Sequence, residues 1–154
     1  MLLLWGYDIF HHMGILQRFD PQKGIVFVVW DGIVTAEEWL RYAQKLVSHP
    51  DWAGTPRILA DLLSVKDTSS IHNREIEHVA KIFSANPRAL RNKKLAVIAQ
   101  DEFGKARHFE DLLMHFGVSS VVFNNLDTAC LFLGMDVLYA YRMLDTMRQE
   151  LQRN

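Results

Sequence analysis

Four consecutive polar residues, Asp67, Thr68, Ser69 and Ser70, lie between a predicted strand and a predicted helix. Any of the three hydroxyls, or the Asp67 carboxylate, can N-cap the helix that follows. The same position also suits an added phosphate, because free N–H groups and the helix dipole stabilise negative charge there. Two interpretations therefore stay open: a helix cap, or a phosphorylation switch at Ser69 or Thr68.

A second group of residues that could bind a ligand is basic. The chain has no acidic residue between positions 77 and 101, and Arg88, Arg91, Lys93 and Lys94 fall in that stretch. They could form a patch for an anion or an acidic partner, or simply a solvated helix end and turn. No aromatic residue interleaves these four, so the stacking expected of a single-stranded nucleic-acid site is not supported.

Other patterns for chemistry are weak. The histidines lack metal-ligand spacing, since His72 and His78 are six residues apart and a helical pair needs four. There is no glycine-rich nucleotide-binding motif and no nucleophile elbow. Cys130 is the only cysteine, which excludes an internal disulfide, and its apolar neighbours predict a small core residue. We therefore expect no metal and no other cofactor.

Paired carboxylates could support acid–base catalysis. Asp101-Glu102 and Glu110-Asp111 are such pairs, but both fall at the edge of a predicted helix, where solvated charge is the expected role. We predict that the protein is not an enzyme. A weaker alternative is an enzyme that uses Asp61 and Asp67 at the end of the third predicted strand.

Composition indicates an ordinary globular domain. The chain has 154 residues, 49% of them hydrophobic and 23% charged, with a net charge of −1. This balance gives no field that would favour nucleic acid or a membrane surface. The apolar start, Met1–Trp5, is shorter than the roughly 20 residues needed to span a bilayer and lacks the features of a secretory signal. We treat residues 1–12 as an appendage and expect a cytoplasmic protein without stable membrane insertion.

Alternating strand and helix patterns predict an α/β fold. Strands are expected at 14–19, 25–30, 57–62, 95–99 and 118–123, with helices after each of the last four. A short loop with Pro21 and Gly24 joins the first two strands as a hairpin. Helical crossovers join the others, which makes those strands parallel. The prediction is a mostly parallel five-stranded sheet with an antiparallel first strand, crossover helices and an extra C-terminal helix.

Two helices carry more specific signals. Thr35 and Glu38 form a capping-box pattern at the start of the first helix. The last helix, from about residue 136, has apolar positions at 137, 140, 141, 144, 147 and 151. This stripe can pack on the chain's own sheet or form a dimer interface.

The segment from Ile58 to Ser70 resembles the STAS domain, a family that includes the bacterial anti-sigma-factor antagonists of the SpoIIAA type. It has a buried strand followed by Asp-Leu and a short loop that carries Asp67, Thr68 and Ser69. In that family a partner kinase phosphorylates the serine of an Asp-Ser-Ser/Thr-Gly motif, and this switches partner binding. The resemblance implies that Ser69 is the phosphoacceptor, whereas Ser70 stands where the motif has glycine.

The wider pattern is similar to the SpoIIAA-like "STAS/SEC14-like" bacterial proteins, which generally have no assigned activity. The similarity lies in Asp31-Gly32, Val34–Trp39, His49–Trp52 and Pro56–Leu62, and it covers residues 13–134. Residues 135–154 form a helix beyond that core. The resemblance implies a non-enzymatic regulatory domain that binds another protein, with a homodimer as a further option.

A different function stays open beside this one. The abundant Phe and Leu residues could line a cavity between helices and sheet, which would suit a carrier or sensor of a small, lipid-like apolar ligand. A closed pocket larger than about 300 Å³ would favour the carrier. An exposed Thr68–Ser70 loop over a filled core would favour the switch.

Overall fold

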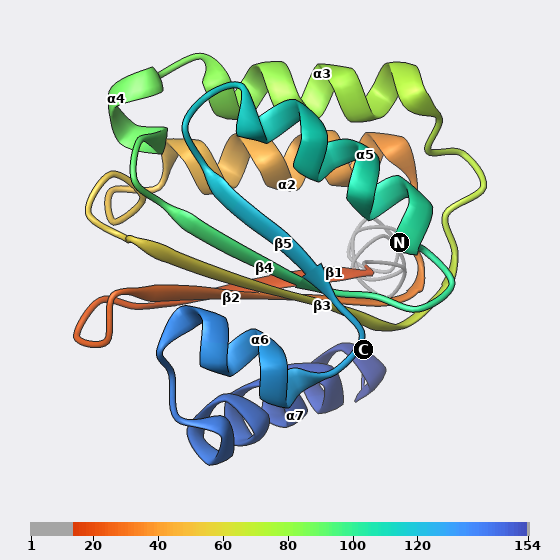
Figure 1. Ribbon diagram of the computed structural model, residues 1–154. Helices are drawn as coiled ribbons and strands as arrows, with labels where there is room; N and C mark the ends of the chain where they lie inside the picture. The colour runs from red at the N-terminus through yellow and green to blue at the C-terminus, as the bar shows by residue number, and fades with distance from the viewer. Residues whose placement is uncertain (1–13, 154) are drawn as a thin grey trace, which may run out of the picture.

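The protein is an α/β sandwich built on one five-stranded sheet (Figure 1). The computed structural model describes residues 14–153. The strands are β1 (Ile15–Asp20), β2 (Ile25–Ile33), β3 (Arg57–Asp67), β4 (Lys94–Ile98) and β5 (Ser119–Phe123). They lie side by side in chain order, with β1 antiparallel to β2 and the other pairs parallel. The predicted fold class and topology are confirmed.

Helices cover both faces of the sheet (Figure 1). One face carries α2 (Ala36–Ser48), α3 (Asn73–Ser84), the short α4 (Pro87–Leu90) and α5 (Phe103–Met114). The other carries α6 (Leu126–Leu133) and α7 (Val137–Arg153). Because right-handed crossovers that always step in one direction stay on one side of a sheet, α2, α3 and α5 share a layer.

Strand β2, which lies between β1 and β3, is buried on both faces. Val26, Val28 and Trp30 pack with the helices of the first layer, whereas Phe27 and Val29 pack with α6 and α7. This explains why its six apolar residues show no alternation, since both faces of the strand are covered.

Strands β2 and β3 run further than their apolar segments predict. The ends of the two strands stay paired, with Asp31 opposite Ser64 and Ile33 opposite Asp67, and register shifts interrupt the pairing. Gly32 adopts a left-handed conformation with φ of 66°, as bulged strands often require. The third strand, predicted to end at residue 62, therefore continues to Asp67, and the chain leaves the sheet only at Thr68.

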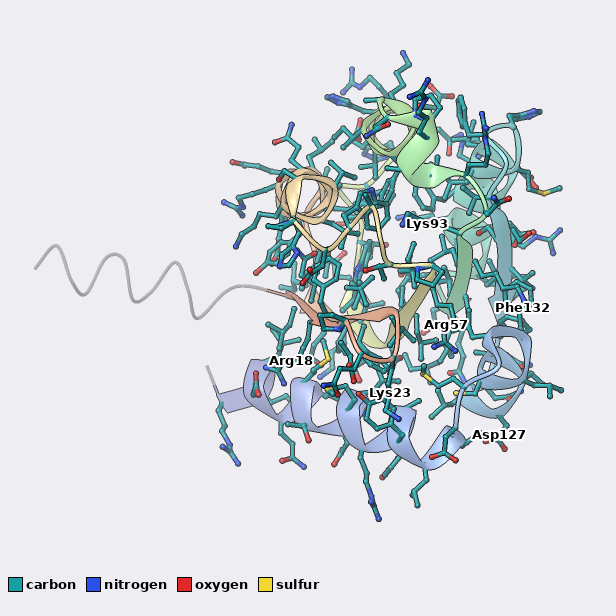
Figure 2. The ribbon with its side chains drawn as sticks, turned by 90° about the vertical axis from the view of Figure 1, so that its left-hand side faces the viewer. Arg18, Lys23, Arg57, Lys93, Asp127 and Phe132 are labelled. Carbon is teal, nitrogen blue, oxygen red and sulfur yellow. The ribbon has the colours of Figure 1, made fainter. Side chains whose placement is uncertain are left out.

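The second layer closes the other side of the sheet. Helix α6 begins after its N-cap residue Asn125, whose Oδ1 accepts a hydrogen bond from the Thr128 N–H at 3.0 Å. Gly134 ends the helix with φ of 67°. Arg57, at the start of β3, donates hydrogen bonds to the last carbonyls of α6 and to the carbonyl of Lys23 in the β1–β2 turn (Figure 2).

Helix α7 packs on its own chain, as one of the two sequence interpretations expects. Ala140, Leu144 and Met147 are buried against the sheet, whereas Val137 and Tyr141 remain exposed. Cys130 on α6 is fully buried in the same cluster, which confirms the core role predicted for it, and burial raises the pKa of its thiol.

Within residues 14–153, no helix has both the length and the apolar character that a membrane crossing requires. The appendage predicted at residues 1–12 lies outside the described part of the chain.

Candidate functional site

Thr68 turns inward from the end of β3. Its side chain is buried, with the residue only 3% exposed. Its Oγ1 donates to Glu102 Oε2 at 2.5 Å and accepts from Lys105 Nζ at 2.9 Å, while Lys105 Nζ also donates to the Thr68 carbonyl at 2.7 Å. Thr68 therefore does not present a hydroxyl to a kinase, because that hydroxyl is held against the start of α5.

The other loop residues divide into different roles. Ser69 is exposed, and its N–H donates to Asp67 Oδ1 at 2.8 Å, which lowers the pKa of that carboxyl. Ser70 Oγ accepts from the Ala36 N–H at 3.0 Å and so helps to cap α2 rather than α3. Among the three hydroxyls, Ser69 alone is both exposed and outside these tertiary contacts.

The expectation that this hydroxyl cluster caps the following helix is wrong. Helix α3 has His72 as its N-cap residue, and the His72 N–H donates to Glu75 Oε1 at 3.1 Å. A turn comes first, in which the Ile71 N–H donates to the Thr68 carbonyl at 2.9 Å. This turn buries Ile71 and delays the helix until after the cluster.

The basic stretch does not form one patch. Arg88, Arg91 and Lys94 are exposed, but Lys93 is only 2% exposed and lies inside the molecule (Figure 2). Its Nζ donates to the carbonyls of Trp52 and Thr55, at 2.6 Å and 2.5 Å, and lies 4.4 Å from the centre of the Trp52 ring. Burial lowers the pKa of Lys93 to about 8. Lys93 thus connects the start of β4 to the loop before β3. Lys94 instead extends to α6, where its Nζ donates to the Phe132 carbonyl at 3.4 Å, so the four residues do not form the predicted patch.

The two carboxylates of the weaker enzyme alternative do not meet. Asp61 faces α7, where it is paired with Arg148 and accepts from the Leu63 N–H at 2.9 Å. Asp67 lies at the exposed loop. They therefore share no site in which they could act as acid and base.

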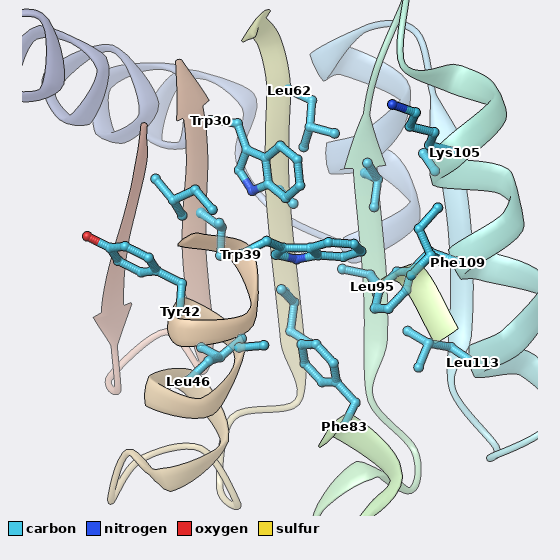
Figure 3. Close-up of a pocket in the computed structure, with 18 of the residues that line it drawn as sticks. Trp30, Trp39, Tyr42, Leu46, Leu62, Phe83, Leu95, Lys105, Phe109 and Leu113 are labelled. Atoms are coloured by element: carbon cyan, nitrogen blue, oxygen red, sulfur yellow. The ribbon is translucent and has the colours of Figure 1, made fainter. Parts of the chain in front are cut away.

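An apolar cavity lies between the sheet and the first helix layer (Figure 3). Its volume is about 100 Å³. Side chains from β2, β3 and β4 form the floor, and those of α2, α3 and α5 form the roof. Nearly all of them are aliphatic or aromatic, so the cavity suits a hydrocarbon rather than a polar substrate.

Aromatic rings frame this cavity. Trp30 of β2 meets Trp39 of α2 edge to face at 5.4 Å between ring centres, Trp39 meets Phe109 of α5 at 5.4 Å, and Phe109 meets Phe83 of α3 at 5.7 Å. Edge-to-face contacts of this kind are specific in geometry and fix ring positions. The walls are therefore ordered by contacts across three helices and the sheet.

One end of the cavity is polar. Thr68, Glu102 and Lys105, which are hydrogen-bonded together, also line it. They follow the carboxyl end of β3 and begin α5, and ligands of parallel α/β sheets usually bind at that edge. The Lys105 side chain is 38% exposed, so this end borders solvent.

Sequence reasoning did not identify Glu102 and Lys105. Asp101 and Glu102 were expected to be solvated alike, yet Asp101 is exposed while Glu102 turns toward Thr68. Their spacing in the sequence could have identified them. Glu102 and Lys105 lie three residues apart at the start of a helix, and the next residues on the same side, Ala106 and Phe109, are apolar and buried. Such spacing places all four on neighbouring faces of the helix.

Metal ligation finds no support in the described part of the chain, where no three His, Cys, Asp or Glu residues are grouped to hold an ion.

Comparisons of the chain with protein-family models, with curated proteins and with solved structures return no match. The resemblance to STAS domains therefore rests on the sequence motifs alone.

Proposed function

We propose that the protein is a non-enzymatic binding domain for a small, mostly apolar molecule with one polar group. The observation that carries the proposal is the apolar cavity that ends on Thr68, Glu102 and Lys105. An apolar pocket with a few convergent polar groups is the usual form of a small-molecule site.

The size of the cavity limits the ligand. Its volume of about 100 Å³ does not reach the roughly 300 Å³ set above as favouring a carrier of a lipid-like ligand, so the proposal is confined to a smaller molecule. An engineered apolar cavity of roughly 150 Å³ accommodates benzene. By that comparison, the cavity itself holds about four carbon atoms of the ligand, and a long lipid chain does not fit.

Titration of the ¹⁵N-labelled protein with straight-chain primary alcohols from propanol to octanol tests this proposal. We expect saturable NMR shifts at cavity residues such as Ala106 and Leu113, with the highest affinity near butanol to hexanol. Ala106→Leu places extra carbon atoms in the cavity and should abolish these shifts.

The matched control is Ala85→Leu, which makes the same change at an exposed position. Shifts that do not saturate, or that survive Ala106→Leu, would contradict ligand binding in the cavity.

A second candidate function is a protein-binding switch at Ser69. Its support is the exposure of Ser69 in the Asp67–Ser70 loop, together with the resemblance to STAS domains. A phosphate there would add about two negative charges to a surface that a partner could contact. Intact-mass measurement of protein from its source cell should find a single phosphate, absent from a Ser69→Ala variant.

Partner capture completes that test. Ser69→Asp should change the set of captured proteins, whereas Ser119→Asp, at another exposed serine, should not. Unphosphorylated protein under all growth conditions, with identical partners for both variants, would refute the switch.

We also propose a cytoplasmic location for the protein and a surface through which two copies associate. The single buried Cys130 agrees with a reducing, cytoplasmic compartment. A homodimer could use the exposed apolar residues Leu131, Leu138 and Tyr141 on α6 and α7.

A further inference from the structure

Two residues of opposite charge line the polar end of the cavity. Glu102 Oε2 and Lys105 Nζ are 3.9 Å apart and contribute one negative and one positive charge. Both atoms also contact Thr68 Oγ1, so the three side chains form one compact group. The residues that line this end therefore carry one charge of each sign, while the exposed Asp67 carboxylate beside them also interacts electrostatically with Lys105.

The same group retains one donor and one acceptor for a ligand. Lys105 has three N–H donors, and two of them reach the Thr68 carbonyl and hydroxyl, at 2.7 Å and 2.9 Å. Glu102 accepts from Thr68 through Oε2, which leaves the acceptor capacity of Oε1. The site can therefore donate one hydrogen bond and accept another at nearly the same place.

We propose that the polar group of the ligand is uncharged and both donates and accepts, as a primary alcohol or a primary carboxamide does. This inference rests on the proposed cavity function. A carboxylate cannot donate a hydrogen bond to Glu102 and would lie beside its negative charge. An ammonium group cannot accept a hydrogen bond from Lys105 and would lie beside its positive charge. Each charged group would also lose hydration at the edge of an apolar cavity, which disfavours it further.

Four probes with one five-carbon body test the inference: 1-pentanol, pentanamide, pentanoate and pentylammonium, titrated at pH 7. The unsubstituted protein should bind the alcohol and the amide with a Kd at least about tenfold lower than that of either ion.

Two substitutions should change this order in opposite directions. Glu102→Gln removes the negative charge that lines the cavity and should move preference toward pentanoate, whereas Lys105→Met removes the positive charge and should move it toward pentylammonium. Asp101→Asn is the control for the first, because it removes a neighbouring exposed charge that does not line the cavity. Lys81→Met, at an exposed position on α3, is the control for the second.

The outcomes separate the two proposals. If none of the four probes binds the unsubstituted protein, the proposed function itself fails. If the probes bind in the cavity with equal affinity, or an ion binds most tightly, the function stands and this inference fails. The ranking on the unsubstituted protein decides the matter even where a variant does not fold.

Discussion

Thr68 fixes the loop after β3 to α5 through its hydroxyl and its carbonyl. Thr68→Val keeps the shape but removes the hydroxyl, which leaves Glu102 and Lys105 each short of one partner. We expect the free energy of unfolding to fall by about 1–3 kcal/mol, measured by urea denaturation. Ser69→Ala, one residue further on and exposed, should change it by no more than about 0.5 kcal/mol. Equal effects of the two substitutions would contradict the buried role of Thr68.

Lys93 should give stability a distinctive pH dependence. Its pKa is lowered from 10.5 to about 8 in the folded protein, so between these values the unfolded chain binds more protons. The free energy of unfolding contributed by Lys93 should therefore rise as pH increases from about 8 toward 10, and stay flat below pH 7. Urea denaturation of the protein and of Lys93→Met should diverge in that window. Parallel pH profiles would mean that the ammonium group is not desolvated.

At the residue scale, the sequence drew attention to the Asp67–Ser70 loop but did not reveal the direction of its side chains. The segment from Asp67 to Ser70 could be singled out because hydroxyl side chains just before a helix can cap it or accept a phosphate. Which side chain points inward depends on where β3 ends and on how α5 packs against that end. Both are set by tertiary structure and cannot be read from the local sequence. The burial of Lys93 was missed for a similar reason, since the Trp52 and Thr55 carbonyls that bind it lie far away in the chain.

Helix α2 receives two caps from different parts of the chain. Thr35 Oγ1 accepts from the Glu38 N–H at 3.2 Å, which is one half of the predicted capping box, and Ser70 Oγ accepts from the Ala36 N–H. The other half is wrong, because the Glu38 carboxylate accepts from the N–H groups of Gly14 and Ile15. Ser70→Ala and Thr35→Ala should each lower the free energy of unfolding by about 1 kcal/mol. Differential scanning calorimetry of the two single variants and the double variant would measure this. A negligible effect of Ser70→Ala would show that the loop does not stabilise α2.

Elements with a strong local signal were predicted well, and their ends less so. The apolar core of β2, the Thr35 start of α2 and the Gly134 end of α6 all follow from local patterns. The extension of β2 and β3 depends on the pairing of polar residues with each other, such as Asp31 with Ser64, which periodicity does not reveal. Helix α4 was missed because a single turn after Asn86-Pro87 is too short to show a period.

At the scale of the whole molecule, α7 completes the core. It covers Phe27 and Val29, and its Arg148 is paired with the buried Asp61. A chain that ends at Gly134 would expose these residues and leave Asp61 without that partner. We expect it to aggregate and to lose cooperative thermal unfolding, as followed by light scattering and circular dichroism.

Removal of residues 152–154 alone is the control for that truncation, because it leaves both Arg148 and the Arg18–Glu150 pair in place. A chain ending at Gly134 that stays monomeric and melts at an unchanged temperature would show that α7 is dispensable.

The order in which the chain builds the sheet has a consequence for its synthesis. All five strands and the first helix layer are complete at Phe123, whereas the residues that cover the second face come last, from 126 to 153. At about 5–20 residues per second, the ribosome needs a few seconds to add them. Until these residues arrive, Ile25, Phe27 and Leu59 lack the helices that cover them, so a chaperone that holds the nascent chain would find apolar side chains to bind there.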